Sequence, residues 1–165
     1  MIILGIDPGL ATIGYGVLKK PKDKKDKIKV IAYDCITTSP KFNPGQRLYK
    51  INRELNKIIK KYNPKVLAVE NIYFFKNLKT AMPVSQAKGV ILMTAAKKKI
   101  PVFEVTPLQV KMTVAGYGKA EKKQVQKMIQ ILLDLKEFPK KDDAADALGV
   151  ALCCAIESER IIKQS

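Results

Sequence analysis

The chain has 165 residues, with 31 Lys or Arg against 15 Asp or Glu, a formal net charge of +16 and no histidine. This length predicts a single domain over residues 1–165, whose core needs no disulfide or zinc support. Without histidine, serine triads and zinc-histidine sites are excluded, so proton transfers must use carboxylates, Lys, Tyr, Cys or a metal-bound water. The positive charge favours nucleic acid as a partner, and a Lys-rich surface kept for solubility or heat resistance is the alternative.

Cysteine usage and the N-terminal residues indicate the compartment. Cys35, Cys153 and Cys154 are odd in number and form no C-x-x-C pair, which favours a reducing cytoplasm. The first residues, MIILGIDPG, lack the basic region of a signal peptide, and no segment approaches the ~18 apolar residues of a membrane span. We therefore expect a soluble cytoplasmic protein with no membrane partner.

The first part of the chain predicts three consecutive strands. Residues 2–6 are apolar and β-branched and end at Asp-Pro-Gly, residues 12–18 alternate in polarity, and residues 28–38 are again strand-like. Residues 19–29 between the last two strands contain seven Lys and two Asp. This composition predicts a solvated hairpin loop.

Helices and strands then alternate. Apolar residues at helical spacing from 48 to 62 predict an amphipathic helix with a basic outer face, and residues 65–70 read as a strand covered on both sides. The further elements are a helix over 80–98, a strand over 100–105, a helix capped by Thr106, a helix over 120–133 and a last helix from about Asp142. This order predicts an α/β fold with a five-stranded mixed sheet, three antiparallel strands followed by parallel βα units, flanked by helices.

Two acidic residues stand at the ends of predicted strands. Asp7 ends the first strand, and Glu70 ends the fourth, which in this topology can lie beside the first. The carboxyl ends of strands are where open α/β sheets bind ligands. A turn-forming Asp and an exposed strand terminus are the ordinary alternatives. Two adjacent carboxylates repel each other unless a cation lies between them.

The pattern of the last predicted helix favours a cation site over these ordinary alternatives. Residues 144–156 are apolar all around except for Asp146, and Asp143 lies three positions earlier on the same helix face. The helix dipole can compensate an acid in the first turn, but its effect has faded by Asp146. Four carboxylates suit Mg²⁺ or Mn²⁺. Two such ions about 4 Å apart can activate a water and stabilise the leaving oxygen of a phosphodiester.

Five segments in order, covering nearly the whole chain, resemble the RuvC family of Holliday junction resolvases, which have an RNase H-like fold. They read LGIDPG with IGYGV, VENIYFFKN, SQAKGV, QVKMTVAGYGKAEKKQV and DDAADALGVA. The resemblance implies a homodimeric, Mg²⁺-dependent endonuclease that nicks two strands of a four-way DNA junction symmetrically. It also implies a branch-migration helicase complex as a partner.

The resemblance also assigns individual residues. The metal-binding acids of the family fall on Asp7, Glu70, Asp143 and Asp146. The DNA-binding residues that we predict are Tyr73, Phe74, Lys76, Asn77, Lys88, Lys111 and Lys122. Of these, Tyr73 is the aromatic near the junction centre, and Lys111 and Lys122 are the active-site lysines.

Two positions depart from the commonest family pattern, and at a third the relatives differ among themselves. Tyr73 stands where Phe is usual, which preserves stacking, and Lys88 stands where Arg is usual, which removes a bidentate phosphate fork. Asp143 is an acid where some relatives have His. The metal site predicted here is therefore made of carboxylates alone.

Other functions remain open from the residues. A non-catalytic or RNA-directed RNase H-like nucleic-acid-binding protein fits the charge, but gives no reason for Asp146 in an apolar helix. An ATPase of the actin and hexokinase type can also open with G-x-D-x-G, but it needs a second phosphate loop and more chain. The predicted helix over 80–98 has more apolar surface than one sheet needs to cover, which favours a two-fold interface.

Overall fold

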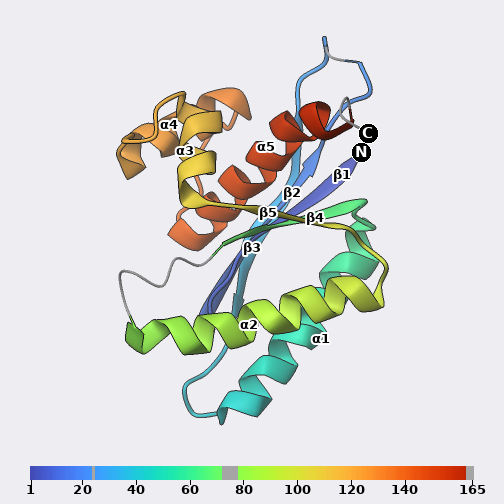
Figure 1. The fold of residues 1–165 in the computed structure, drawn as a ribbon, viewed down its shortest axis with the longest axis vertical. Helices are drawn as coiled ribbons and strands as arrows, with labels where there is room; N and C mark the ends of the chain where they lie inside the picture. The colour runs from blue at the N-terminus through green and yellow to red at the C-terminus, as the bar shows by residue number, and fades with distance from the viewer. Residues whose placement is uncertain (24, 72–77, 163–165) are drawn as a thin grey trace.

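A five-stranded mixed sheet forms the centre of the computed structural model, which describes residues 1–23, 25–71 and 78–162 (Figure 1). The strands are β1 (Ile2–Asp7), β2 (Thr12–Lys19), β3 (Lys29–Thr37), β4 (Val66–Glu70) and β5 (Val102–Val105), in the spatial order β3-β2-β1-β4-β5. β2 pairs antiparallel with β1 and β3, while β1, β4 and β5 are parallel. The predicted strand order along the chain and the mixed sheet are confirmed.

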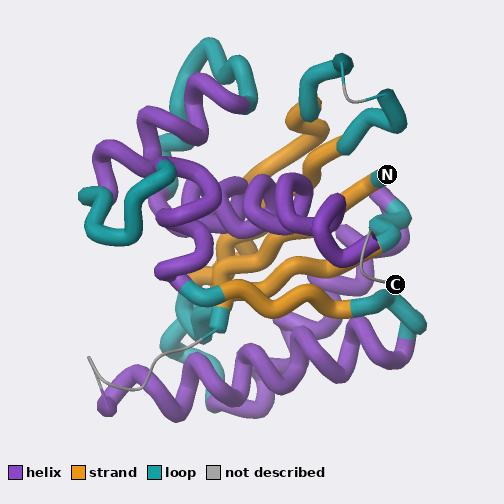
Figure 2. Tube along the Cα trace, turned by 45° about the horizontal axis from the view of Figure 1, so that its top comes forward, coloured by secondary structure: helices purple, strands orange, loops and turns teal. Residues whose placement is uncertain are grey.

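Helices cover both faces of this sheet (Figures 1 and 2). They are α1 (Pro44–Tyr62), α2 (Leu78–Lys97), α3 (Pro107–Ala115), α4 (Lys122–Leu132) and α5 (Asp142–Ile162). One apolar core joins α1 and α2 to one face of the sheet, and a second core joins α5, α3 and α4 to the other. The same alternation of side chains along each strand supplies both cores, because successive residues point to opposite faces.

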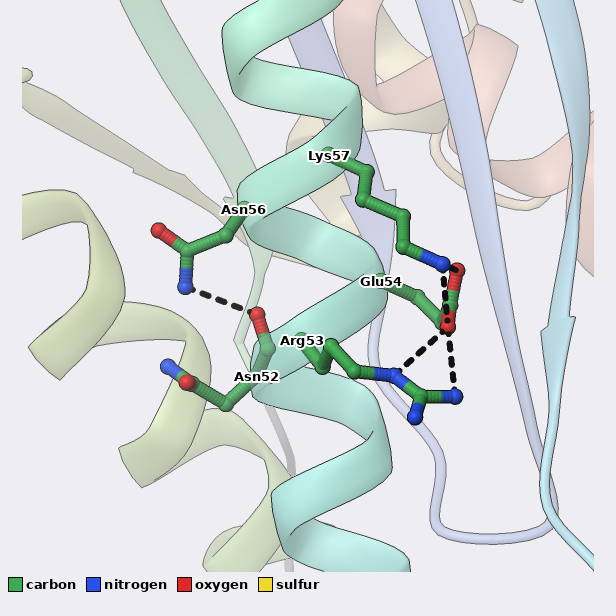
Figure 3. Close-up of polar contacts among 5 residues, drawn as sticks. All are labelled: Asn52, Arg53, Glu54, Asn56 and Lys57. Carbon is green, nitrogen blue, oxygen red and sulfur yellow. Dashed lines mark hydrogen bonds and ion pairs between the residues drawn. The ribbon is translucent and has the colours of Figure 1, made fainter.

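The helix α1 confirms the predicted amphipathic pattern. Its buried residues are Ile51, Leu55, Ile58 and Ile59. On its outer face, Arg53 and Lys57 both donate to the carboxylate of Glu54, with nitrogen to oxygen distances of 3.0 Å (Figure 3). The basic face of α1 is therefore partly neutralised by its own acid.

The boundaries of α3 follow the predicted capping signals. The Thr106 hydroxyl accepts a hydrogen bond from the backbone N–H of Gln109, Pro107 occupies the first turn, and Gly116 ends the helix in the left-handed region with φ 73°.

Among the helices that the structure describes, none combines the length and apolar composition that crossing a bilayer demands.

The apolar residues of α2 are divided between the core and the outer face of the helix. Ala87, Ile91 and Ala95 are fully buried against the sheet and α1, so they belong to the core of a single chain. The exposed apolar surface of α2 comes from Met82 and Met93, whose exposed fractions are 71% and 48%. An interface on α2 therefore has to use this outer face.

Candidate functional site

Asp7 and Glu70 lie at the same edge of the sheet, as predicted. β1 and β4 are adjacent and parallel, with Ile6 paired to Val69, so the next residue of each strand is a carboxylate. Ile3, Ala68 and Val105 belong to the core beneath α5. Since side chains alternate, Asp7 and Glu70 also point to the α5 face.

Two glycines bring α5 unusually close to the sheet. A β-carbon on Gly14 would lie 1.8 Å from the carbonyl oxygen of Asp143, and one on Gly5 would lie 2.4 Å from the carbonyl oxygen of Ala147. Any side chain at these positions would push the helix away from β1 and β2. The glycines therefore let the first turns of α5, with Asp143 and Asp146, approach the strand that ends in Asp7.

The start of α5 is also tied to the far side of the sheet. Lys141, just before the helix, donates to the carboxylate of Asp34 in β3 at 2.9 Å. This contact and the close approach over Gly14 hold the first turn of α5 over β2 and β3. Local sequence alone does not contain this constraint, because it joins residues 107 positions apart.

Burial and mutual repulsion act on the acids. The pKa of Asp7 is raised to about 8, first by burial and then by the negative charges of Glu70, Asp146 and Asp143. The pKa of Glu70 is raised to about 7, by burial and by Asp146. Burial also raises the pKa of Asp146. These shifts mark a cluster of carboxylates in which negative charge exceeds positive charge.

One cation of the chain already lies in the cluster. The Nζ of Lys122, at the start of α4, is 3.2 Å from Oδ2 of Asp146 and 3.2 Å from Oδ2 of Asp142. Its charge lowers the pKa of Asp7, Glu70 and Asp146, against the larger effect of burial. Lys122 thus compensates part of the acidic charge.

A pocket joins both predicted active-site lysines to the acids. It is lined by Glu70 and Asp146 together with Lys111, Lys122 and Pro107, and by apolar and polar side chains of α3, α4 and α5. The predicted proximity of Glu70, Asp146, Lys111 and Lys122 is therefore present in the structure. An anionic ligand in this pocket would lie between two ammonium groups and the carboxylates.

The four acids suit a divalent cation by their chemistry and location. They offer only oxygen ligands, which Mg²⁺ and Mn²⁺ prefer, and the raised pKa values of Asp7 and Glu70 show that they need positive charge. Within residues 1–23, 25–71 and 78–162, however, no three Asp, Glu, His or Cys side chains are arranged to hold an ion together as they stand. Simultaneous coordination therefore requires side-chain rotation in the cluster.

The remaining predicted DNA-binding residues fall in two places. Tyr73, Phe74, Lys76 and Asn77 lie outside the described residues. Lys88 lies on the α2 side of the sheet, where its ammonium donates to Asn71 and to Glu104. Sequence reasoning did not single out Asn71 or Glu104, and the available signal was a polar residue, Glu104, inside the otherwise apolar strand Val102–Val105.

A mixed sheet of this order, with acids at the ends of β1 and β4 and on the helix packed across them, defines an RNase H-like fold. The family model described as "Crossover junction endodeoxyribonuclease RuvC" matches residues 3–154. The chain therefore belongs to the RuvC family.

Individual relatives agree over almost the whole chain. The crossover junction endodeoxyribonuclease RuvC of Halothermothrix orenii is 49% identical, covering 93% of this chain and 91% of its own length. That of Thermosipho melanesiensis is 46% identical, covering 96% and 99%. The solved structure of Thermus thermophilus RuvC superposes with a TM-score of 0.90 at 32% identity, covering 97% of this chain and 96% of that one. The predicted RNase H-like fold and the family resemblance are confirmed.

Proposed function

We propose that this chain is a Holliday junction resolvase, a metal-dependent endonuclease that cuts two strands of a four-way DNA junction symmetrically during recombination and repair. The observation that carries the proposal is the convergence of Asp7, Glu70, Asp143 and Asp146 at one edge of the sheet, in a chain of the RuvC family. A Thermus thermophilus RuvC structure with the same TM-score of 0.90 is described as a complex with Holliday junction substrate, which supports the same substrate here.

The acids would hold two Mg²⁺ ions, with Mn²⁺ as a substitute. When bound, such ions activate a water and stabilise the leaving oxygen of the phosphodiester, chemistry that needs no histidine. The positive charge of Lys122 lowers the pKa of Asp146 and so favours its ionised form, against burial, which raises that pKa. Lys111 and Lys122 line the pocket beside Glu70 and would attract the scissile phosphate.

DNA affinity and junction preference have different sources in this proposal. The net charge of +16 attracts any DNA through its phosphates, and this attraction weakens as salt rises. Preference for the junction would come from two sites fixed in a dimer and from Tyr73 and Phe74 stacking on bases unpaired at the junction centre. Lys76, Asn77 and Lys88 remain predicted DNA contacts, and a branch-migration helicase complex remains a predicted partner.

The outer face of α2 is the proposed dimer interface. Met82, Gln86, Gly89 and Met93 follow helical spacing and are all exposed. In the part of the chain that the structure describes, a β-carbon on Gly89 would meet no atom within 4 Å beyond the backbone of its own helix, so the described fold does not require a glycine there. A second copy packed closely against Gly89 would account for it and would provide the second active site.

The test is cleavage of a four-way junction with a movable core, mapped on all four strands in the presence of Mg²⁺ and of Mn²⁺. Symmetric pairs of nicks are expected. Asp7→Asn, Glu70→Gln, Asp143→Asn and Asp146→Asn should each abolish cleavage and leave junction binding without metal intact, because each removes an ion ligand and no positive charge. Asp134→Asn, which changes an exposed acid after α4, is the matched control and should cleave normally.

Three outcomes would overturn the proposal. Full cleavage by any two of the four acid variants would remove the proposed site. Junction binding with no cleavage in either metal would favour a non-catalytic binding protein. Preferred cleavage of an RNA strand would favour an RNA-directed relative.

A further inference from the structure

Lys88 of α2 joins the ends of two strands of the sheet. Its ammonium donates to the side-chain oxygen of Asn71, the residue after β4, and to the carboxylate of Glu104 in β5. Only 13% of the Lys88 side chain is exposed, so the charge lies largely out of water and depends on these two partners. Two of its three donors are therefore used inside the chain.

This contact lies on the face of the sheet opposite the acids. Ala68 and Val105 belong to the core beneath α5, whereas Leu67 and Val69 belong to the core beneath α1 and α2. By this alternation Glu70 points to α5 and the acidic cluster, and Asn71 points to α2. Lys88 thus contacts Asn71, the residue after Glu70, from the face of the sheet opposite the acids.

Glu70 has fewer backbone constraints than the rest of β4. The pairing of β4 with β1 ends at Ile6 and Val69, so among the described strand residues Glu70 is paired with Val105 of β5 alone. One further backbone bond, from the Asn71 N–H to the Val105 carbonyl at 2.7 Å, continues the sheet beyond it. Strand ends open easily when such bonds stand alone. The contact of Lys88 with Asn71 and Glu104 adds a side-chain tie across the same two strands.

We propose that Lys88 is a positioning residue of the nuclease site, which fixes the backbone at Glu70 by tying Asn71 to Glu104. This inference rests on the proposed function of Glu70 as an ion ligand. It differs from the predicted phosphate contact of Lys88, because a positioning role acts through Glu104 and a phosphate contact does not. The pair Lys88 and Glu104 can therefore separate the two roles.

The experiment is a charge exchange across the pair. Lys88→Glu places two carboxylates together and should lower the cleavage rate at saturating junction by about 10- to 100-fold, the usual effect of losing a residue that orients a metal ligand. Glu104→Gln should lower it less, because a neutral hydrogen bond remains. The double variant Lys88→Glu with Glu104→Lys should restore cleavage to within about fivefold of the unchanged protein, since the Asn71 amide can rotate to donate to Glu instead of accepting from Lys.

Two further measurements separate positioning from folding and from DNA binding. Mn²⁺ affinity, measured by calorimetry without DNA, should fall by about tenfold in Lys88→Glu and recover in the double variant. Junction affinity without metal should fall no more in Lys88→Glu than in Lys97→Glu, the matched charge change at the end of the same helix. Thermal unfolding shows whether Lys88→Glu folds. If it does not fold, Glu104→Gln and Lys88→Arg are measured in its place. Glu104→Gln should then have weakened Mn²⁺ affinity, and Lys88→Arg should have normal Mn²⁺ affinity.

The opposite results would overturn the inference. If Lys88→Glu loses junction affinity while its Mn²⁺ affinity is normal, and Glu104→Lys does not rescue it, Lys88 contacts DNA. If Glu104→Gln has normal Mn²⁺ affinity, the tie does not position Glu70. Failure of the unchanged protein to cut junctions would instead reject the proposed function, which keeps the two failures distinct.

Discussion

The Nζ of Lys122 lies 3.2 Å from Oδ2 of Asp146, which places the charge of α4 against the acidic face of α5. Lys122→Gln should therefore raise the pKa of Asp146, Glu70 and Asp7, because each loses a positive neighbour. The acidic limb of the cleavage rate against pH should move to higher pH. Cleavage at pH 7 should fall by about fivefold, since a partly exposed ion pair contributes about 1 kcal/mol.

The control for this prediction is the adjacent Lys123→Gln, which removes the same charge from an exposed position of α4. It should leave the pH dependence of cleavage unchanged. Equal pH profiles for Lys122→Gln and the unchanged protein would mean that the ion pair has no effect on the acids.

Without divalent cations, Asp7 should make the folded protein less stable as pH rises. Its pKa is about 8 in the fold against 3.8 as a free side chain, so the folded state binds the proton more tightly. Stability from this group is complete below about pH 4 and is lost between pH 4 and 8. Asp7→Asn should therefore raise the free energy of unfolding at pH 8 by about 2 kcal/mol, or the Tm by about 5 °C.

Thermal unfolding in EDTA at pH 5 and pH 8 measures this effect. Asp26→Asn, an exposed acid of the Lys-rich loop, should change the Tm little at either pH. Addition of Mn²⁺ should stabilise the unchanged protein more than Asp7→Asn, because the folded state then binds a ligand. A lower Tm of Asp7→Asn at pH 8 would contradict the prediction.

Gly14→Ala should displace the first turn of α5, because the added β-carbon would lie 1.8 Å from the backbone oxygen of Asp143. We expect a loss of about 2 kcal/mol in the free energy of unfolding, in the range of overpacked cores. Cleavage should fall much further than stability explains, since Asp143 and Asp146 move with the helix. Denaturant unfolding and junction cleavage check both effects.

Gly45→Ala is the matched control, because its β-carbon would meet only the Asn43 side-chain oxygen at 3.4 Å, an ordinary contact. Its stability and cleavage should be close to those of the unchanged protein. Normal cleavage by Gly14→Ala would show that the close approach of α5 is not needed.

Glu54→Gln should increase DNA affinity. It releases Arg53 and Lys57 from the carboxylate that they now share, and both cations are already more than half exposed (Figure 3). We expect affinity for duplex and junction alike to rise about threefold at low salt. The slope of log affinity against log salt concentration should steepen by about the amount that one additional phosphate contact contributes. Lys57→Ala should weaken both only slightly. Binding titrations over a salt series measure these changes.

An equal charge change elsewhere is the control, and Glu137→Gln, at an exposed acid in the segment before α5, supplies it. The two variants would behave identically if only net charge mattered. A difference confined to Glu54→Gln indicates that the outer face of α1 contacts DNA.

Gly89→Gln should dissociate the proposed dimer without harming the fold. Among the described residues, no atom beyond the backbone of its own helix lies within 4 Å of a β-carbon placed on Gly89, and Gln is a better helix former than Gly by about 0.5 kcal/mol or more. The variant should sediment as a monomer at micromolar concentration and lose paired nicking. Its Tm should be no lower than that of the unchanged protein when both are measured at concentrations at which they are monomeric. Lys97→Gln should keep the assembly of the unchanged protein. A monomeric unchanged protein, alone and on a junction, would reject the interface.

The element order, the mixed sheet and most element boundaries followed from local pattern. Apolar alternation and helical spacing are properties of neighbouring residues, and Thr106 with Pro107 marks a helix start by local hydrogen bonding. The four acids could also be proposed from sequence, because Asp7 and Glu70 end apolar strands and Asp146 interrupts an apolar helix. Spacing alone did not show which apolar residues of α2 enter the core, since it does not distinguish Ala87 in a core from Met93 on a surface.

Tertiary structure decided which of these residues act on one another. The closeness of α5 to the sheet depends on Gly14 meeting Asp143, and the charge balance of the site depends on Lys122 reaching Asp146 from another helix. Lys88 of α2 joins Asn71, which follows β4, to Glu104 of β5, on the face of the sheet opposite the acids. Such contacts join residues that are distant along the chain, so hydrophobic periodicity does not predict them. The family motifs pointed to Lys122 and Lys88 but not to the atoms that they contact, because the packing of helices on the sheet determines those distances.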